Sequence, residues 1–292
     1  MRKVLMEEMV VWVLAICFAV FVLIYLLLIM PRLGKRKEGV YFTKWLYAHR
    51  GLHDTALGVP ENSMAAFGRA VEAGYGIELD IQLSKDKIPV VFHDFTLKRV
   101  CGAEGKVSDY TYEELRNFRL SGSEEKIPKL EEVLALVDGR VPLIVEFKIE
   151  FTDLSLCPIA DKLLREYKGQ YCMESFNPLG VLWYRRNHKE VIRGQLADHF
   201  HKEGEYRGLL YFLLQNLLFN FLTKPDFIAY NRKYPKKMSR RLCRGLYGNL
   251  GAAWTIRSRE ELAEAEKYFD IFIFEGFIPT ENSGNNHTIK PK

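Results

Sequence analysis

Residues 77–94 read IELDIQLSKDKIPVVFHD, and this stretch decides the expected fold. Two short apolar runs flank the polar segment 84–87, which has the length of a hairpin turn. Side chains two positions apart on a strand point to the same side, so Glu78 and Asp80 face one way together. The stretch therefore predicts a strand that carries two carboxylates, followed by a strand extension that ends in His93.

Two other apolar runs also end in reactive side chains. One run precedes His49-Arg50-Gly51, and the other precedes Glu146-Phe147-Lys148. By the same alternation, Glu146 and Lys148 share one side of their strand. Three carboxylates and two histidines converge if these strands end at one edge of a sheet.

The carboxylates of this group require a neutralising charge, because crowded acidic groups raise one another's pKa. A hard divalent cation, Mg²⁺ or Ca²⁺, is the natural partner of an all-oxygen set, so Glu78, Asp80 and Glu146 are the candidate metal ligands. Arg50 and Lys148 add cationic donors, which suit a substrate that carries phosphate. With the two histidines as proton shuttles, the pattern favours metal-assisted cleavage of a phosphate ester.

These groups resemble the motifs of the glycerophosphodiester phosphodiesterase family, in the order in which that family carries them. The resemblance covers about residues 46–278, and eight motifs in register are far more specific than any one tripeptide. The matching motifs are His49-Arg50-Gly51, Pro60-Glu61-Asn62-Ser63, Glu78-Leu79-Asp80, Pro89-Val90-Val91-Phe92-His93-Asp94, Ile127-Pro128-Lys129-Leu130-Glu131-Glu132-Val133-Leu134, Glu146-Phe147-Lys148, Ser175-Phe176-Asn177-Pro178 and Ala253-Trp254-Thr255.

The resemblance implies an α/β fold, the (β/α)₈ TIM barrel, and a phosphoric diester hydrolase. It implies that His49 and His93 act as general acid and base, in an order that the sequence leaves open. The implied ligands of the divalent metal are Glu78, Asp80 and Glu146, and the implied phosphate contacts are Arg50 and Lys148.

Three further positions flank this group. Trp254 ends the predicted seventh strand, where it is a candidate wall for the glycerol carbons or a core aromatic. The family usually has an apolar residue followed by Thr-Asp where this chain has Ile273-Phe274-Glu275-Gly276. The resemblance places no metal ligand there, so we expect the chemistry to survive this departure and the local loop to differ. Asp94 is expected to cap the turn after His93 rather than to contact it, because neighbours on a strand point to opposite sides.

The rest of the chain alternates strand and helix signals in the order typical of one parallel barrel. Residues 38–280 are expected to form this domain, with a small insertion after the second strand at about 95–122. Within the insertion, Tyr110 and Phe118 either fill a core or line the entrance. Residues 281–292 are polar and Asn-rich, so we expect a disordered tail.

Residues 9–30 form an uncharged run that is long enough to cross a bilayer as a helix. The competing interpretation is a cleavable signal peptide, but the run exceeds the usual ~7–15-residue apolar region and no small-x-small cleavage site follows it. We therefore expect residues 1–37 to be a single-pass membrane anchor with a basic flank. Four Lys/Arg follow the helix and two precede it, so the positive-inside rule favours a cytoplasmic catalytic domain.

Residues 209–222 form a second apolar stretch, which is too short to span a bilayer comfortably. A helix that is apolar nearly all round is either buried or faces lipid. Two interpretations stay open. The segment dips into the membrane surface beside the active site, or it is a barrel helix packed on both sides.

The composition of this 292-residue chain, with 48% hydrophobic and 27% charged residues, is that of one large globular domain. Its net charge of +5 reflects basic residues beside the membrane segment and in residues 232–244, without a nucleic-acid-binding motif, so no nucleic acid partner is expected. The five cysteines lack metal-like spacing and favour reduced thiols.

The expected function is hydrolysis of a glycerophosphodiester to an alcohol and glycerol 3-phosphate, or of a lysophospholipid to lysophosphatidic acid. The nucleophile is water or the substrate's own glycerol 2-hydroxyl. The alternative enzyme is a related barrel phospholipase that releases a cyclic phosphate. A further alternative is that the chain is not an enzyme but a lipid-binding membrane protein. The presence of every implied catalytic residue disfavours this alternative.

Overall fold

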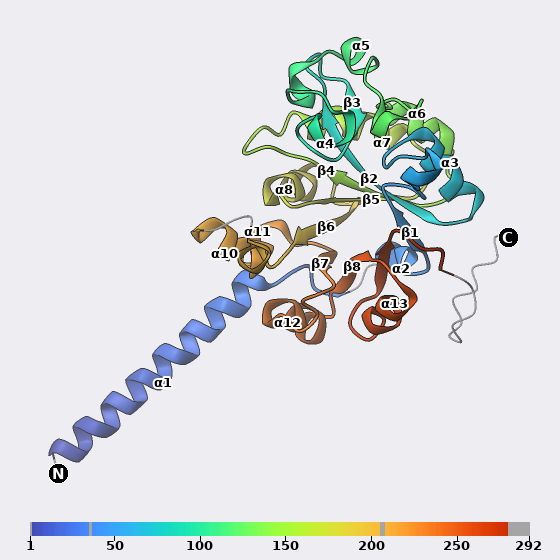
Figure 1. The fold of residues 1–292 in the computed structure, drawn as a ribbon. Coiled ribbons are helices and arrows are strands. Elements are labelled where there is room, and N and C mark those ends of the chain that lie inside the picture. The colour runs from blue at the N-terminus through green and yellow to red at the C-terminus, as the bar shows by residue number, and fades with distance from the viewer. Residues whose placement is uncertain (1, 35–36, 205–207, 280–292) are drawn as a thin grey trace.

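A closed barrel of eight parallel strands forms the body of the protein (Figure 1). The computed structural model describes residues 2–34, 37–204 and 208–279. Strand pairing follows the order β1-β9-β8-β7-β6-β5-β4-β2 and closes from β2 back to β1, while β3 pairs antiparallel with the end of β2. The strands are β1 (Leu46–His49), β2 (Gly76–Leu83), β3 (Pro89–Val91), β4 (Leu143–Phe147), β5 (Tyr171–Ser175), β6 (Ile192–Ala197), β7 (Phe227–Asn231), β8 (Leu250–Ile256) and β9 (Ile271–Phe274). The predicted TIM barrel and strand extension are confirmed.

Helices cover the outside of this barrel, and α2 lies before its first strand (Figure 1). Side-chain caps define several helix starts, as at α3, where the Ser63 hydroxyl accepts from the Ala66 N–H at 3.1 Å. The α-helices are α1 (Arg2–Ile29), α2 (Lys37–Phe42), α3 (Met64–Glu72), α4 (Lys98–Cys101), α5 (Tyr112–Leu115), α6 (Leu130–Val137), α7 (Leu156–Glu166), α8 (Pro178–Asn187), α9 (Phe200–Glu203), α10 (Leu209–Gln215), α11 (Asn220–Thr223), α12 (Met238–Tyr247) and α13 (Arg259–Ala265).

Inward-pointing side chains fill the barrel near the N-terminal ends of its strands. Tyr47 is fully buried there beside Ile144, and its hydroxyl donates to the Phe42 carbonyl of α2 at 3.1 Å. Gly76 on the neighbouring strand leaves room for this ring, because a Cβ at that position would lie 2.6 Å from the ring. The polar groups of the site lie further along the same inward-facing rows.

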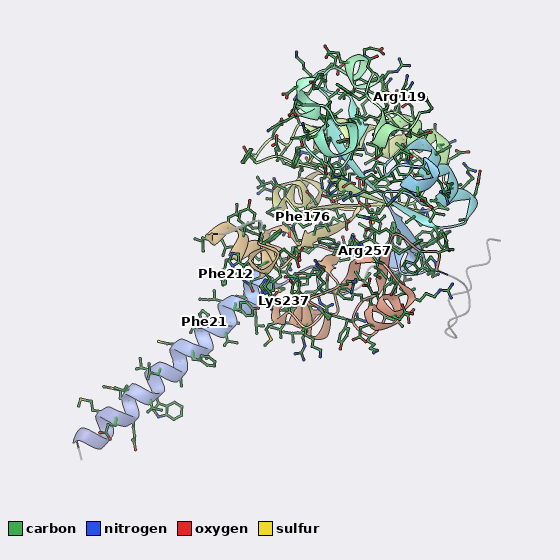
Figure 2. All side chains as sticks on the ribbon, viewed as in Figure 1. Phe21, Arg119, Phe176, Phe212, Lys237 and Arg257 are labelled. Atoms are coloured by element: carbon green, nitrogen blue, oxygen red, sulfur yellow. The ribbon has the colours of Figure 1, made fainter. Side chains whose placement is uncertain are left out.

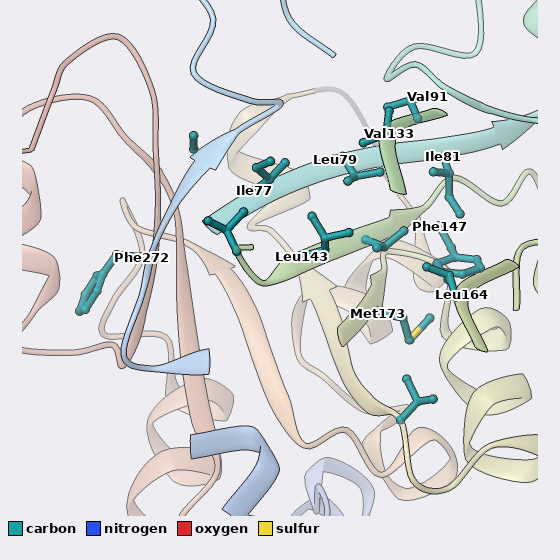
Figure 3. Close-up of a cluster of buried hydrophobic side chains, with 14 of the residues drawn as sticks. Ile77, Leu79, Ile81, Val91, Val133, Leu143, Phe147, Leu164, Met173 and Phe272 are labelled. Carbon is teal, nitrogen blue, oxygen red and sulfur yellow. The ribbon is translucent and has the colours of Figure 1, made fainter. Parts of the chain in front are cut away.

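The outward faces of the strands form the larger core (Figure 3). Leu79 and Ile81 of β2 are fully buried and pack toward the covering helices, from which Val133 of α6 and Leu164 of α7 contribute. Complete burial of such a side chain stabilises the fold by about 1.5–3 kcal/mol. The outward-pointing residues of β2 thus pack against the helices. Its inward-pointing residues, Glu78 and Asp80, lie in the barrel interior.

The insertion after the second strand has a core of its own, built around buried residues such as Phe92, Leu115 and Leu120. The rings of Tyr110 and Phe118 meet edge to face at 5.2 Å and pack against that core. Of the two expectations for these aromatics, core filling is the one that the structure supports.

Helix α1 projects away from the barrel, and Phe21 lies exposed along it (Figures 1 and 2). Within the described residues, the 24-residue segment Met6–Ile29 is the one helix long and apolar enough to cross a membrane. At 1.5 Å per residue it is about 36 Å long, against ~30 Å for a hydrocarbon core. The expected tail at 281–292 lies outside the described residues.

The apolar stretch 209–222 is not one continuous helix. It folds as α10 and α11, separated by a turn in which Leu217 has a φ of 61° and is buried. By contrast, Leu209 is 73% exposed. Phe212 is 47% exposed and lies on the side of the barrel from which α1 departs (Figure 2). Phe221 and Leu222 of α11 are also exposed, at 39% and 38%, so burial holds for the turn between the two helices and each helix keeps exposed apolar side chains.

Candidate active site

Strand register brings the predicted site residues together at the C-terminal ends of β1, β2 and β4. His49 is in register with Glu78, and Asp80 is in register with Glu146. The His49 Nε2 lies 3.9 Å from the Glu78 Oε2. Residues from three separate segments therefore share one rim of the barrel, which is the rim where TIM barrels carry their active sites.

A buried triad of carboxylates, Glu78, Asp80 and Glu146, forms the centre of this rim. One oxygen from each lies within 4.8 Å of the others. Burial, followed by the charges of Asp80 and Glu146, raises the pKa of Glu78 well above its ordinary value. Burial also raises the pKa of Glu146, although Lys148 opposes the change. Repulsion among buried carboxylates is the pattern expected of a cation site.

Asp80 tests whether the triad fits a divalent cation. Its Oδ1 is buried and accepts no hydrogen bond from the described residues, although Lys148 Nζ lies 3.5 Å away. Its Oδ2 accepts from Asn62 Nδ2 at 2.9 Å. Burial favours a higher pKa, but the charges of His93, Lys148 and Arg50 outweigh it and hold the pKa of this carboxyl below its ordinary value. An ionised carboxylate with a free oxygen fits Mg²⁺ or Ca²⁺.

Arg50 and Lys148 place positive charge against the triad. The Arg50 N–H donates to Glu78 Oε2 at 3.1 Å, and its guanidinium Nε lies 3.5 Å from Asp80 Oδ2. Lys148 Nζ donates to Glu146 Oε1 at 2.9 Å. Arg50 also has a φ of 55°, a left-handed conformation that costs a non-glycine residue about 1–3 kcal/mol. The surrounding fold therefore holds this arginine firmly over the acidic group.

Glu275 is a site residue that the sequence analysis missed. It continues the inward row of Ile271 and Ile273 past the end of β9, and its carboxylate pairs with the Nδ1 of His49. Burial and the charge of Arg50 lower the pKa of His49 to about 4, while Glu275 opposes that change. The departure from the family pattern thus extends beyond the local loop to a contact with His49. Alternation along β9 is the signal that would have identified the residue.

Glu275→Ala is expected to lower kcat by about 10–100-fold, because loss of a partner that orients a functional histidine has effects of this size. Glu275→Gln keeps a hydrogen-bonding group beside His49 Nδ1 and is expected to retain more activity than the alanine variant. Steady-state rates of phosphodiester hydrolysis measure both. Wild-type kcat in Glu275→Ala would show that this carboxylate does not position the imidazole.

Asp94 contacts His93 directly, which contradicts the expectation for this pair. The Nδ1 of His93 lies 2.5 Å from Asp94 Oδ1. The alternation argument fails because β3 ends before these residues, which lie in the following turn. Arg99 donates to both oxygens of Asp94, at 2.6 and 3.0 Å, and also to Glu61, which in turn accepts from Arg50 at 2.8 Å. Both histidines therefore have a carboxylate on Nδ1.

Glu174 is the second acidic residue that the sequence analysis missed. It is in register with Glu146 on the next strand and is 1% exposed. Its Oε2 has no hydrogen-bond partner among the described residues. Burial, and then the charges of Glu146 and Asp80, raise its pKa well above the ordinary value. Alternation from Cys172 along β5 would have identified it.

Trp254 lies in a row of aromatic side chains at the barrel mouth. Its ring meets Phe176 edge to face at 5.7 Å, and Phe176 lies 6.0 Å from Phe200. Phe200 in turn lies 5.5 Å from Tyr211 of α10. The indole is only partly buried, so it has the features of both a core aromatic and a wall. The row connects the end of β8 with the apolar segment that begins at α10.

Comparison with known proteins places this arrangement among related sequences. The Glycerophosphoryl diester phosphodiesterase family matches residues 49–167. Glycerophosphodiester phosphodiesterase 1 from Bos taurus is 41% identical over 258 residues, covering 76% of this chain and 74% of the relative. A glycerophosphodiester phosphodiesterase from Caldanaerobacter subterraneus is 41% identical over 128 residues, covering 41% of this chain and 51% of the relative. This chain thus spans about half the length of such bacterial relatives.

Solved structures share the fold. A phosphodiesterase from Oleispira antarctica, determined in complex with the product sn-glycerol-3-phosphate, superposes with a TM-score of 0.63 at 21% identity. The match covers 79% of this chain and 92% of that structure. A glycerophosphodiester phosphodiesterase from Thermotoga maritima superposes with a TM-score of 0.61 at 24% identity, covering 78% of this chain and 93% of that structure.

Proposed function

Because this chain belongs to the glycerophosphodiester phosphodiesterase family, we propose that it hydrolyses a glycerophosphodiester to an alcohol and glycerol 3-phosphate. One observation carries the proposal. Three buried carboxylates, two histidines and two cationic side chains meet at one rim of the barrel, where His93 is close enough to Asp80 to lower the pKa of that carboxyl. The product complex of the Oleispira relative supports glycerol 3-phosphate as the product here.

The chain's own residues divide the work of phosphodiester cleavage. Glu78, Asp80 and Glu146 would hold a divalent cation, which when bound supplies positive charge for the phosphoryl oxygens. Arg50 donates hydrogen bonds to the phosphate, where preorganised donors stabilise the charge that develops in the transition state. Lys148 keeps Glu146 and Asp80 from repelling each other.

The two histidines carry the protons. One imidazole removes the proton from the nucleophile, which is water or the glycerol 2-hydroxyl, and the other donates a proton to the leaving oxygen. Glu275 holds Nδ1 of His49, and Asp94 holds Nδ1 of His93, so in both rings Nε2 remains for the substrate. These two contacts do not decide which imidazole is the acid.

Hydrolysis by the purified full chain tests this proposal. Glycerophosphocholine, glycerophosphoethanolamine and lysophosphatidylcholine are offered after chelation, with Mg²⁺ or Ca²⁺ added back separately. We expect activity to disappear on chelation and to return with one of the two ions. Phosphorus NMR identifies the product, since an accumulating cyclic phosphate would indicate the phospholipase-like alternative. Lipid binding without turnover would indicate the non-catalytic alternative.

A lysophospholipid is a second candidate substrate, and the aromatic row favours it. Trp254, Phe176, Phe200 and Tyr211 extend from the barrel mouth toward α10. Such a surface suits an acyl chain, whereas a glycerophosphodiester without an acyl chain can place only its headgroup there. Exposed Leu209 and Leu210 continue the apolar surface beyond the row.

Phe176→Ala separates the two substrates. Loss of a buried aromatic contact is worth about 1–2 kcal/mol, so kcat/KM for lysophosphatidylcholine is expected to fall about tenfold. We expect kcat/KM for glycerophosphocholine to change less than threefold, because the carboxylate triad and the histidines are untouched. Equal losses with both substrates would mean that the row supports the site structurally and does not contact an acyl chain.

We also propose that α1 anchors the protein in a membrane. Support comes from its length, its exposed apolar surface and the exposed Phe212 near its base (Figure 2). The larger number of Lys/Arg after the helix than before it favours a cytoplasmic catalytic domain.

A further inference from the structure

A pocket of about 380 Å³ lies where α1 joins the barrel, on elements that the proposed catalytic site does not use. Met30, Pro31 and Leu33, which follow α1, form its apolar wall. The other wall comes from α8 and from the segments that lead into β6 and β7. The pocket therefore lies toward the N-terminal ends of these strands, whereas the carboxylate triad lies at the opposite ends.

Hydrogen bonds fix the last turn of α1 beside this pocket. Asn220 Nδ2 donates to the Ile29 carbonyl at 3.0 Å, and the Tyr247 hydroxyl donates to the Leu26 carbonyl at 2.9 Å. These bonds satisfy carbonyls that the C-terminal turn of a helix leaves without intrahelical partners. The pocket is thus held at a constant position relative to the proposed membrane helix.

The pocket has a mainly apolar surface, and the charged side chains around it are all basic. Among the described residues, the basic ones that line it are Arg32, Arg185, Lys189, Arg193 and Lys224. Arg185 donates through Nη1 to backbone carbonyls at the end of α11, which leaves the rest of its guanidinium for another acceptor. The nearby carboxylate of Asp226 is buried. Its two oxygens lie 3.6 Å from Arg32 Nε and 3.5 Å from Arg193 Nη1 at the start of β6.

Lys224 is a second basic residue whose side chain is held at the pocket wall. It has a φ of 44° at the C-cap of α11, a position that favours glycine. Burial and the neighbouring charge of Arg185 lower its pKa, so the lysine tolerates both backbone strain and repulsion. Its Nζ donates to the Met30 carbonyl at 3.1 Å, which keeps the ammonium at the pocket wall.

We propose that this pocket binds the phosphate of an anionic phospholipid headgroup. The basic residues that line the pocket outnumber the nearby carboxylate of Asp226, and such an excess of cationic donors suits a phosphate anion. A lipid is a better source than free phosphate, because the same pocket has an apolar wall and opens at the end of an apolar helix. The lipid would hold the barrel against the bilayer. The inference rests on the membrane anchoring proposed above.

Native mass spectrometry of the full chain tests the pocket. The protein is extracted into detergent with equal amounts of phosphatidylglycerol and phosphatidylcholine, and bound lipid is counted. We expect one phosphatidylglycerol to be retained with about tenfold preference. A Lys or Arg near an anionic lipid surface is worth about 1 kcal/mol, so Arg185→Gln and Lys224→Gly should each lower that preference about fivefold.

Arg119→Gln is the matched control, because Arg119 lies in the insertion, far from α1 (Figure 2). It should leave the preference unchanged. Lys224→Gly relieves the left-handed strain, so it carries the test even if Arg185→Gln fails to fold. Equal retention of both lipids, or unchanged preference in Lys224→Gly, would overturn the proposal. Displacement of the lipid by millimolar inorganic phosphate would overturn the lipid assignment in favour of a free-phosphate site.

Two measurements separate the pocket from the anchor. Flotation of the full chain with phosphatidylcholine vesicles reports insertion of α1, whereas binding of dihexanoyl phosphatidylglycerol over dihexanoyl phosphatidylcholine reports the headgroup site without a bilayer. Failure to float with retained headgroup preference would remove the anchor and support the pocket. Flotation without headgroup preference would keep the anchor and overturn the pocket.

Discussion

Asp80→Asn is expected to lower kcat/KM about 10³-fold and to abolish saturable binding of Mg²⁺ or Ca²⁺. Asp80 is the carboxylate of the triad whose pKa is held low, and its buried Oδ1 accepts no hydrogen bond from the described residues. The change removes one negative charge without changing the shape of the side chain. A metal contribution of several kcal/mol to the transition state corresponds to a loss of this size.

Titration calorimetry with each ion and steady-state hydrolysis of glycerophosphocholine measure the two effects together. Asp161→Asn is the matched control, since Asp161 is also a buried aspartate but pairs with Arg165 and His188 outside the site. It should bind the ion as the wild type does. If Asp80→Asn bound the ion with wild-type affinity, the triad would not be the metal site.

His93→Gln is expected to lower kcat about 10³-fold, within the range of 10²–10⁴ typical of a general acid or base. Glutamine can still accept or donate hydrogen bonds near Asp94, but it cannot exchange a proton at neutral pH. His49→Gln is expected to give a loss of similar size. When two groups act in one reaction, their losses are strongly non-additive, so the double variant should be only slightly slower than either single variant.

His188→Gln is the control for this series, because His188 also contacts carboxylates but lies away from the rim, beside Asp161 and Glu190. Its kcat should equal that of the wild type. Circular dichroism melting curves of each variant show whether the fold is retained. A folded His93→Gln variant with more than about one tenth of wild-type kcat would contradict the acid–base role.

The alternation of side chains along single strands was sufficient to predict much of the candidate site. Alternation along β2 predicts that Glu78 and Asp80 point inward, and the same rule applied to β4 predicts the inward direction of Glu146 and Lys148. The parallel register then brings these residues together. Prediction failed where the chain left the strands, as at Asp94, because side-chain alternation holds only while the backbone is extended.

The sequence by itself determined the β/α order, the acidic and histidine groups at the strand ends, and an apolar helix before the barrel. Only the tertiary structure decided that Glu275 pairs with His49, 226 positions away, and that Arg32 meets Arg185 and Lys224 at the base of α1. The physical reason is closure of the sheet. Periodicity is a local property of the chain, whereas the pairing of β1 with β9 and the docking of α1 depend on contacts between residues far apart in sequence.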